Sequence, residues 1–328
     1  MTPERPLAVG VIGVGTMGQH HARVYDDLEE ATLVGVFDVD AERAKAIAER
    51  HGTAAMGLEA LLERVDAVSV AVPTAHHHSV ATTCLDAGVP VLVEKPVVAD
   101  PETGRDLLAR ADAAGVPVQV GHVERFNPAV ETLAEIVEEL SIVALTASRL
   151  GPPPARRIED SAVLDLMIHD IDVVLALLGE EPVDVAGCGV AGNRHAGALL
   201  EFPEAMASLT ASRLTQRKVR TLEITAEECL VVVDYLEQSV EIHRRSVPEY
   251  VERAEGVRFR HESLIERVRV PNDEPLRNEL ASFLETVRTG STPEVTIDDG
   301  LAALEIARRI EARKPSERPR ADLGVLHD

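Results

Sequence analysis

The sequence VGVIGVGTMGQHHARVY, residues 9–25, decides the fold. Its first residues form an apolar run typical of a buried strand, the glycine-rich GVGTMG follows at residues 13–18, and a helical pattern comes next. The three glycines allow a tight turn, a close approach of backbone to a pyrophosphate, and close packing of helix on strand. The stretch predicts a dinucleotide-binding turn, in which the cofactor contacts Gly13, Gly15, Thr16, Met17 and Gly18.

A second strand is predicted at residues 32–38 and ends on Asp38, at about the 20-residue separation from the glycine turn that is typical of such folds. A carboxylate at this position accepts hydrogen bonds from ribose hydroxyls and would repel the additional phosphate of NADP. No Arg directly follows Asp38. The pattern favours NAD as the cofactor; the alternative is a parallel-sheet turn that binds no ligand.

The pattern of strands and helices changes near residue 122. Before it, strands and helices alternate, as in a parallel sheet, with strands predicted at 7–13, 32–38, 66–72, 90–94 and 117–121 and helices at 41–50, 76–87 and 101–114. After it, strands with alternating polarity dominate, at 141–150, 196–202, 206–214, 219–226, 229–235 and 239–243, with helices near 127–140, 161–178, 275–289 and 298–313. We therefore expect an α/β protein with a Rossmann domain at 1–122, an α+β domain at 123–313 and a loose charged tail at 314–328.

The amino-acid composition limits the environments and partners that we expect for this protein. The net charge is −23, and among the 33 basic residues Lys occurs only at 45, 95, 218 and 314. Self-repulsion of such a surface is screened in molar salt, where the Debye length is about 3 Å, so we expect a protein adapted to a salty cytoplasm. The acidity argues against a nucleic-acid partner, and the absence of a long apolar run argues against a membrane. The three cysteines lack metal-ligand spacing.

Ligands of a parallel sheet sit outside the carboxyl ends of its strands, so residues 72–74, 94–96 and 121–122 are expected to line one crevice, with Val72, Pro73 and Glu94 near the cofactor. Lys95 is a candidate catalytic residue because a desolvated Lys can lower its pKa and donate to a reacting hydroxyl. The bond from Lys95 to Pro96 is a candidate cis peptide. The alternative is an ordinary surface Lys after a strand.

The segment DLMIHDID, residues 165–172, places Asp165, His169 and Asp172 on one face of a helix. A carboxylate one turn away can orient an imidazole, so His169 is a candidate general base. A metal site or an ordinary surface helix is the alternative on spacing alone. The consecutive histidines at 20–21 and 76–78 point in different directions on a helix and do not predict a metal site, although one of 76–78 can touch the cofactor.

Arginines near the second wall of the crevice are candidates for binding an anionic substrate, because Arg binds phosphate in a bidentate manner. They are Arg125, Arg149, Arg156 and Arg157. The alternative is that these side chains are solvated or form salt bridges within the protein.

Together these motifs resemble the glucose-fructose oxidoreductase and inositol dehydrogenase family. The motifs are VIGVGTMG (11–18), VPTAHH (72–77), EKP (94–96), GHVERFNP (121–128), DLMIHDID (165–172) and EPLRNELASFLETVRTG (274–290). The resemblance implies a Rossmann domain followed by an open, largely antiparallel sheet, pairing into a homodimer or homotetramer through that sheet, and an active site made of Lys95, Asp165 and His169. It also matches His77 to a cofactor-side His, although residues 72–74 depart from the Thr-Pro-Asn of the family motif.

Within the family, the motifs look most like those of the UDP-N-acetylglucosamine 3-dehydrogenases. That resemblance implies that His169 removes the proton of the sugar 3-hydroxyl, that Lys95 hydrogen-bonds the same oxygen and that Asp165 orients the base. Asn127, in the GHVERFNP motif, and the four arginines are then expected on the substrate side. Alternatives are a dehydrogenase of inositol or of another sugar or nucleotide sugar, and, in another class, a dinucleotide-binding regulator without turnover.

Overall fold

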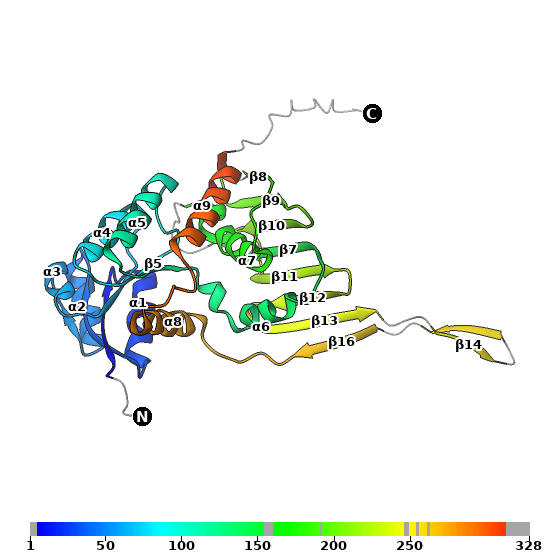
Figure 1. The fold of residues 1–328 in the computed structure, drawn as a ribbon, viewed down its shortest axis with the longest axis horizontal. Coiled ribbons are helices and arrows are strands. Elements are labelled where there is room, and N and C mark those ends of the chain that lie inside the picture. Colours follow the sequence, from blue (N-terminus) through cyan, green and yellow to red (C-terminus); the bar gives the residue numbers. More distant parts are fainter. Residues whose placement is uncertain are drawn as a thin grey trace, which may run out of the picture.

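The protein folds into two parts that lie side by side (Figure 1). The computed structural model describes residues 5–153, 160–190, 192–245, 249–253, 256–260 and 263–312. One part is built on a six-stranded sheet and the other on an eight-stranded sheet. In the described residues, no helix is both long enough and apolar enough to cross a bilayer.

The N-terminal sheet is entirely parallel and has the order β3-β2-β1-β4-β5-β6. Its strands are β1 (Leu7–Ile12), β2 (Ala31–Phe37), β3 (Ala54–Ala55), β4 (Ala67–Val70), β5 (Val91–Glu94) and β6 (Val118–Gly121). The helices that connect them are α1 (Thr16–Asp27), α2 (Ala41–Arg50), α3 (Leu58–Leu62), α4 (His77–Asp86) and α5 (Pro101–Ala114), with a short 3-10 turn, η1 (Thr74–His76). Every residue of β4, β5 and β6 is buried, as expected for strands covered by helices on both faces. The predicted Rossmann sheet is confirmed, and only the short edge strand β3 was not predicted.

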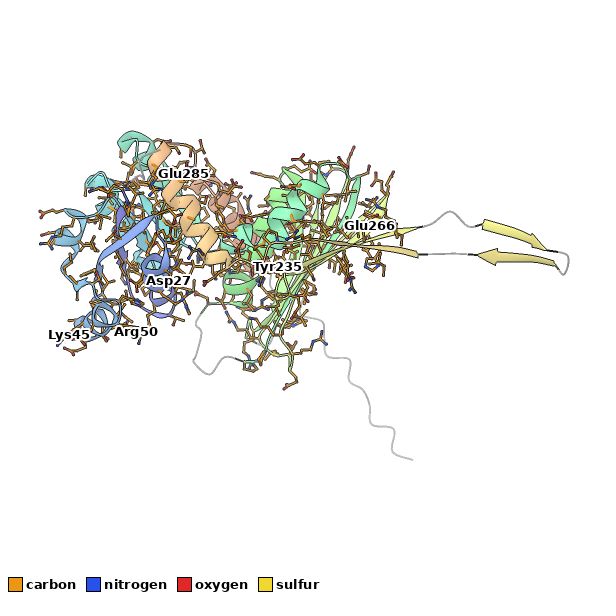
Figure 2. The ribbon with its side chains drawn as sticks, turned by 90° about the horizontal axis from the view of Figure 1, so that it is seen from below. Asp27, Lys45, Arg50, Tyr235, Glu266 and Glu285 are labelled. Atoms are coloured by element: carbon orange, nitrogen blue, oxygen red, sulfur yellow. The ribbon has the colours of Figure 1, made fainter. Side chains whose placement is uncertain are left out.

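The second sheet has the order β16-β13-β12-β11-β7-β10-β9-β8 and is antiparallel except for the pair of β7 and β10. Its strands are β7 (Ile142–Leu150), β8 (Asp184–Val190), β9 (His195–Glu201), β10 (Met206–Ser212), β11 (Val219–Ala226), β12 (Cys229–Asp234), β13 (Ser239–Arg245) and β16 (Ser263–Val268). The predicted, largely antiparallel sheet is thus confirmed, although β8 and β16 were missed. β14 (Glu249–Arg253) and β15 (Gly256–Arg260) pair separately and extend away from both parts (Figure 2).

Within the described residues, helices cover one face of the eight-stranded sheet. Along β10, Ala207, Leu209 and Ala211 are buried, whereas Met206 and Ser208, which alternate with them, are exposed. The buried face packs on α6 (Pro128–Val137), α7 (Ile168–Leu178) and α9 (Ile297–Ala312). This alternation is the pattern from which the strands were predicted.

The last two helices return toward the N-terminal part. Leu280, Phe283 and Leu284 of α8 (Pro275–Thr289) belong to the same buried apolar cluster as Val11 and Tyr25. Helix α9 contacts both α5 and α7. Helix α8, which follows the second sheet in the chain, therefore packs on the Rossmann part.

Candidate active site

The glycine turn after β1 fits the pyrophosphate of a dinucleotide. Gly13 has a φ of +85°, and a Cβ there would lie 2.7 Å from Cγ1 of Val72. A Cβ on Gly18 would lie 1.8 Å from the carbonyl oxygen of Gly13, so helix and turn touch. A Cβ on Gly15 would meet nothing within 4 Å, and no side chain caps the N-terminus of α1. The backbone at Gly15 thus faces open space beside free helical N–H groups, as phosphate binding requires.

Asp38 is held rigidly where β2 ends. Its Oδ2 accepts a hydrogen bond from the Val14 N–H at 2.9 Å, and its Oδ1 accepts one from the Asp40 N–H at 2.9 Å. Nη1 of Arg43 lies 3.3 Å from Oδ2, an ion pair that the sequence argument missed because it considered only the next residue. Each carboxylate oxygen keeps acceptor capacity, so Asp38 can still bind ribose hydroxyls.

Lys95 joins the Rossmann edge to the second part of the molecule. It follows β5 and precedes a cis peptide bond to Pro96. Its Nζ donates to the backbone oxygen of Asp165 at 2.7 Å and lies 3.4 Å from Oδ1 of the same residue. Only 16% of the Lys95 side chain is exposed. The structure therefore brings together Lys95 and Asp165, which are far apart in sequence.

Arg213 is a member of the site that the sequence analysis missed. It follows β10, and its Nη2 donates to Oδ2 of Asp165 at 2.5 Å. It also donates to the backbone oxygens of Asp160 and Ser161. Burial disfavours the ionised form of Asp165, but Lys95 and Arg213 outweigh burial and lower the pKa of its carboxyl. The sequence held no signal for Arg213 as a site residue, because the strand was predicted to run to residue 214 and Arg213 fell within it, whereas β10 ends at Ser212.

His169 lies in the first turn of α7, directly after η3 (Val163–Met167), a turn of π-helix. Burial, with the positive charges of Lys95 and Arg149, lowers the pKa of His169 well below its usual value. The imidazole is therefore neutral near pH 7 and can accept a proton. Its Nδ1 is buried without a hydrogen-bond partner. The carboxylate of Asp165 binds Lys95 and Arg213, and no hydrogen bond joins it to His169 among the contacts of the described residues.

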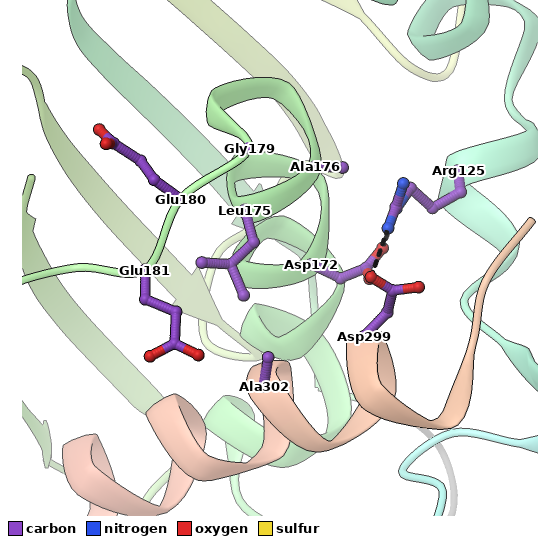
Figure 3. Close-up of a pocket in the computed structure, with 9 residues that line it drawn as sticks. All are labelled: Arg125, Asp172, Leu175, Ala176, Gly179, Glu180, Glu181, Asp299 and Ala302. Atoms are coloured by element: carbon purple, nitrogen blue, oxygen red, sulfur yellow. Dashed lines mark hydrogen bonds and ion pairs between the residues drawn. The ribbon is translucent and has the colours of Figure 1, made fainter.

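A second cluster lies on the far side of His169. The ring of His122, which follows β6, stands edge-on to the ring of His169 with centroids 6.3 Å apart. Beyond it, Asp172 accepts a hydrogen bond from Nε of Arg125 at 3.0 Å, and Asp299 lies close to the same guanidinium (Figure 3). These three side chains line a cavity of about 420 Å³ between α7 and α9.

His77 and Glu94 lie within the wall of the crevice. The ring of His77 is 1% exposed, with Nδ1 2.9 Å from the backbone oxygen of Pro96 and Nε2 2.9 Å from that of Val72. It therefore ties the segment after β4, including Pro73, to the segment after β5. Oε1 of Glu94 lies 2.8 Å from Nε2 of His21, again inside the protein. In the described chain, no group of three or more His, Cys, Asp or Glu is placed to hold a metal ion.

Two residues expected on the substrate side have internal partners. Nε and Nη2 of Arg149 donate to the two carboxylate oxygens of Asp170 at 2.9 and 2.8 Å, and Nη1 donates to Glu124 at 2.6 Å. For Arg149 the structure thus shows the salt-bridged alternative. The side chain of Asn127 caps α6, accepting from the Ala129 N–H. Arg156 and Arg157 lie outside the described residues.

Comparison with known proteins agrees with this geometry. The model of an oxidoreductase family with an NAD-binding Rossmann fold matches residues 7–122, and the model of the GFO/IDH/MocA C-terminal domain matches residues 141–232. UDP-N-acetylglucosamine 3-dehydrogenase of Acidithiobacillus ferrooxidans is 37% identical over 73% of this chain and 77% of its own.

Two further comparisons cover more of the chain. A solved structure of the same Acidithiobacillus ferrooxidans enzyme superposes with a TM-score of 0.85 and 32% identity, covering 94% of this chain and 97% of the other. Inositol 2-dehydrogenase of Rhizobium meliloti is 27% identical over 91% of this chain and 94% of its own. The chain belongs to the GFO/IDH/MocA family of NAD-binding oxidoreductases.

Proposed function

We propose that this enzyme oxidises the 3-hydroxyl of UDP-N-acetylglucosamine to a ketone. The observation that carries the proposal is the contact of Lys95 with Asp165 at the carboxyl end of β5, with the neutral His169 near enough for the charge of Lys95 to lower its pKa. The choice of sugar rests on the 37% identity to a UDP-N-acetylglucosamine 3-dehydrogenase. The second candidate is inositol or another sugar, and the identity to an inositol dehydrogenase over nearly the whole chain supports it.

In the proposed mechanism, His169 is the general base. Its neutral imidazole accepts the proton of the substrate hydroxyl, and Lys95 donates a hydrogen bond to the same oxygen and holds it in place. Asp165 fixes the ammonium group of Lys95, and Arg213 fixes Asp165 from the other side. Bound NAD would supply the hydride acceptor for the carbon that carries this hydroxyl. The glycine turn and Asp38 would hold that cofactor at the edge where Lys95 lies.

A nucleotide diphosphate needs positive charge in a protein whose net charge is −23. Because Arg149 binds Asp170 and Glu124, we leave it out of the substrate site. Arg125, Arg156 and Arg157 remain the proposed diphosphate ligands, and Arg125 would have to share its guanidinium with Asp172. This part of the proposal predicts that Arg156→Ala and Arg157→Ala raise KM for a nucleotide sugar and leave NAD binding unchanged.

Assays with NAD and a panel of substrates test the proposal. We expect NADH formation with UDP-N-acetylglucosamine; reduction of NAD by inositol alone would favour the second candidate. Lys95→Met should lower kcat by about 10²–10⁴ because it removes the donor to the reacting oxygen, while NAD affinity stays unchanged. NAD binding without turnover on any sugar of the panel would instead support a dinucleotide-binding regulator.

We also propose that the uncovered face of the eight-stranded sheet joins copies of this chain. Leu199 and Met206 lie on this face, on the neighbouring strands β9 and β10, and are 42% and 44% exposed; Leu199 pairs with Ser208 and Met206 with Glu201. Leu199→Glu should convert the oligomer to monomers in light scattering. A wild-type protein that is monomeric at micromolar concentration would contradict this proposal.

A further inference from the structure

Three buried ring nitrogens near the base have no hydrogen-bond partner among the described residues. They are Nδ1 of His169 and both Nδ1 and Nε2 of His122. An unpartnered buried polar group costs about 1–3 kcal/mol, so buried imidazoles normally pair with a carbonyl, as His77 does. His122 is completely buried and its ring faces that of His169 edge-on, at an interplanar angle of 85°. No hydrogen bond holds either ring at these nitrogens, so a rotation of one ring or a bridging water can connect the two.

On its other side, His122 approaches a route to solvent. Its Nδ1 lies 3.9 Å from Oδ2 of Asp172. Asp172 lines the cavity between α7 and α9, which also carries Arg125 and Asp299 on its wall (Figure 3). A separation of 3.9 Å exceeds a direct hydrogen bond but is closed by one water or by a small rotation of the ring. His122 is therefore next to both His169 and Asp172, and Asp172 lines this cavity.

We propose that His122 relays the proton of the reaction from His169 to Asp172 and the cavity. This inference rests on the proposed role of His169 as general base. As the O–H bond of the substrate breaks, a new N–H bond forms at Nε2 of His169, and the proton on Nδ1 leaves for His122. His122 in turn gives up a proton from Nδ1 toward Asp172. The hydride leaves the carbon for NAD, the oxidant of this family, so the products are ketone, NADH and one released proton.

The charges around His122 suit transfer rather than storage of a proton. Burial lowers the pKa of His122; the nearby cations Arg125 and Lys95 also lower it, whereas Asp172 and Glu94 raise it. The resting ring is therefore neutral near pH 7 and holds an extra proton only in passing. In the proposed mechanism, substrate and cofactor would occupy the crevice on the Nε2 side of His169 until product leaves. The route from Nδ1 through His122 would let the proton leave before then.

The timing of proton release tests the relay. In a single turnover in weakly buffered solution, NADH absorbance and a pH-indicator dye report hydride transfer and proton release separately. For the wild type we expect both signals to rise together, before product dissociates. In His122→Gln we expect proton release to lag NADH formation at least tenfold, and Asp172→Asn should show the same lag. His243→Gln, a partly exposed His on β13, is the matched control and should behave as wild type.

Two other results would contradict the proposed relay. Wild-type proton release that waits for product release would overturn the relay, and so would His122→Gln releasing its proton in step with NADH. The wild-type timing makes this test independent of whether the variants fold, and fluorescence titration with NADH checks that they bind cofactor normally. A wild type that forms no NADH from any sugar of the panel would overturn the proposed function and the relay with it.

Discussion

Replacing Arg149 by Met separates a structural arginine from a substrate-binding one. Arg149 is 3% exposed, its three guanidinium nitrogens bind Asp170 and Glu124, and its Cζ lies 5.3 Å from the ring centre of Tyr235. Breaking a buried ion pair from one side costs about 3–5 kcal/mol, and loss of the cation–π contact adds about 0.5–2 kcal/mol. Arg149→Met should therefore destabilise the protein by about 3.5–7 kcal/mol.

The assay is thermal unfolding followed by circular dichroism, with steady-state kinetics on the same samples. A loss of this size lowers Tm by roughly 5–10 °C in a protein of this length, because the unfolding entropy is about 2 cal/mol/K per residue. Arg267→Met is the control: its ion pair with Glu241 is on the surface, so its cost is at most about 1 kcal/mol. Adding Asp170→Leu to Arg149→Met should recover part of the loss, since it removes the carboxylate left unpaired. An Arg149→Met protein with wild-type Tm and a raised KM for the nucleotide sugar would refute the structural role.

Three further predictions concern the cofactor, the base and the surface. Gly18→Ala should abolish NAD binding in calorimetry, because its Cβ would lie 1.8 Å from a backbone oxygen; near-normal affinity would show that the turn can relax. The pKa of His169 is lowered well below its ordinary value of 6.5, so the ring stays neutral when the pH falls through 6.5. We therefore expect kcat/KM to stay level through pH 6.5 and to decline only at lower pH. His169→Asn should abolish turnover. Since the net charge of −23 is screened by salt, Tm should rise between dilute buffer and molar KCl; an unchanged Tm would contradict adaptation to salt.

Much of the fold could be predicted because its signals are local. The turn at 13–18, Asp38 and the apolar runs of the parallel strands each report on neighbouring residues, and the predicted helices 41–50, 101–114 and 275–289 agree with α2, α5 and α8. The strands that were missed after residue 122, β8 and β14 to β16, have weaker sequence signals. For example, β8 contains two glycines among its seven residues. Glycines interrupt the period-two pattern on which strand prediction depends.

The site could be predicted only in part, because its contacts join distant segments. The sequence identified Lys95, Asp165 and His169 as candidates, but not that Asp165 binds Lys95 and Arg213 instead of His169. Nor does residue type distinguish Arg149, enclosed by Asp170 and Glu124, from an arginine that faces substrate. The partners of Asp165 and Arg149 depend on which strand ends lie together in the folded protein. No local sequence pattern predicts this.

The geometry of the site depends on how many residues the π-helical turn η3 contains, as well as on which residues they are. A π-turn accommodates one residue more than the α-helix it interrupts. Deleting Leu166 or Met167 would therefore leave a continuous α-helix and place Asp165 three residues before His169 instead of four, which changes the direction in which the Asp165 side chain leaves the helix. Such a deletion would keep Lys95, Asp165 and His169 and still alter the contact of Asp165 with Lys95. A relative with a gap at this point can thus preserve these three residues and the fold while losing this arrangement.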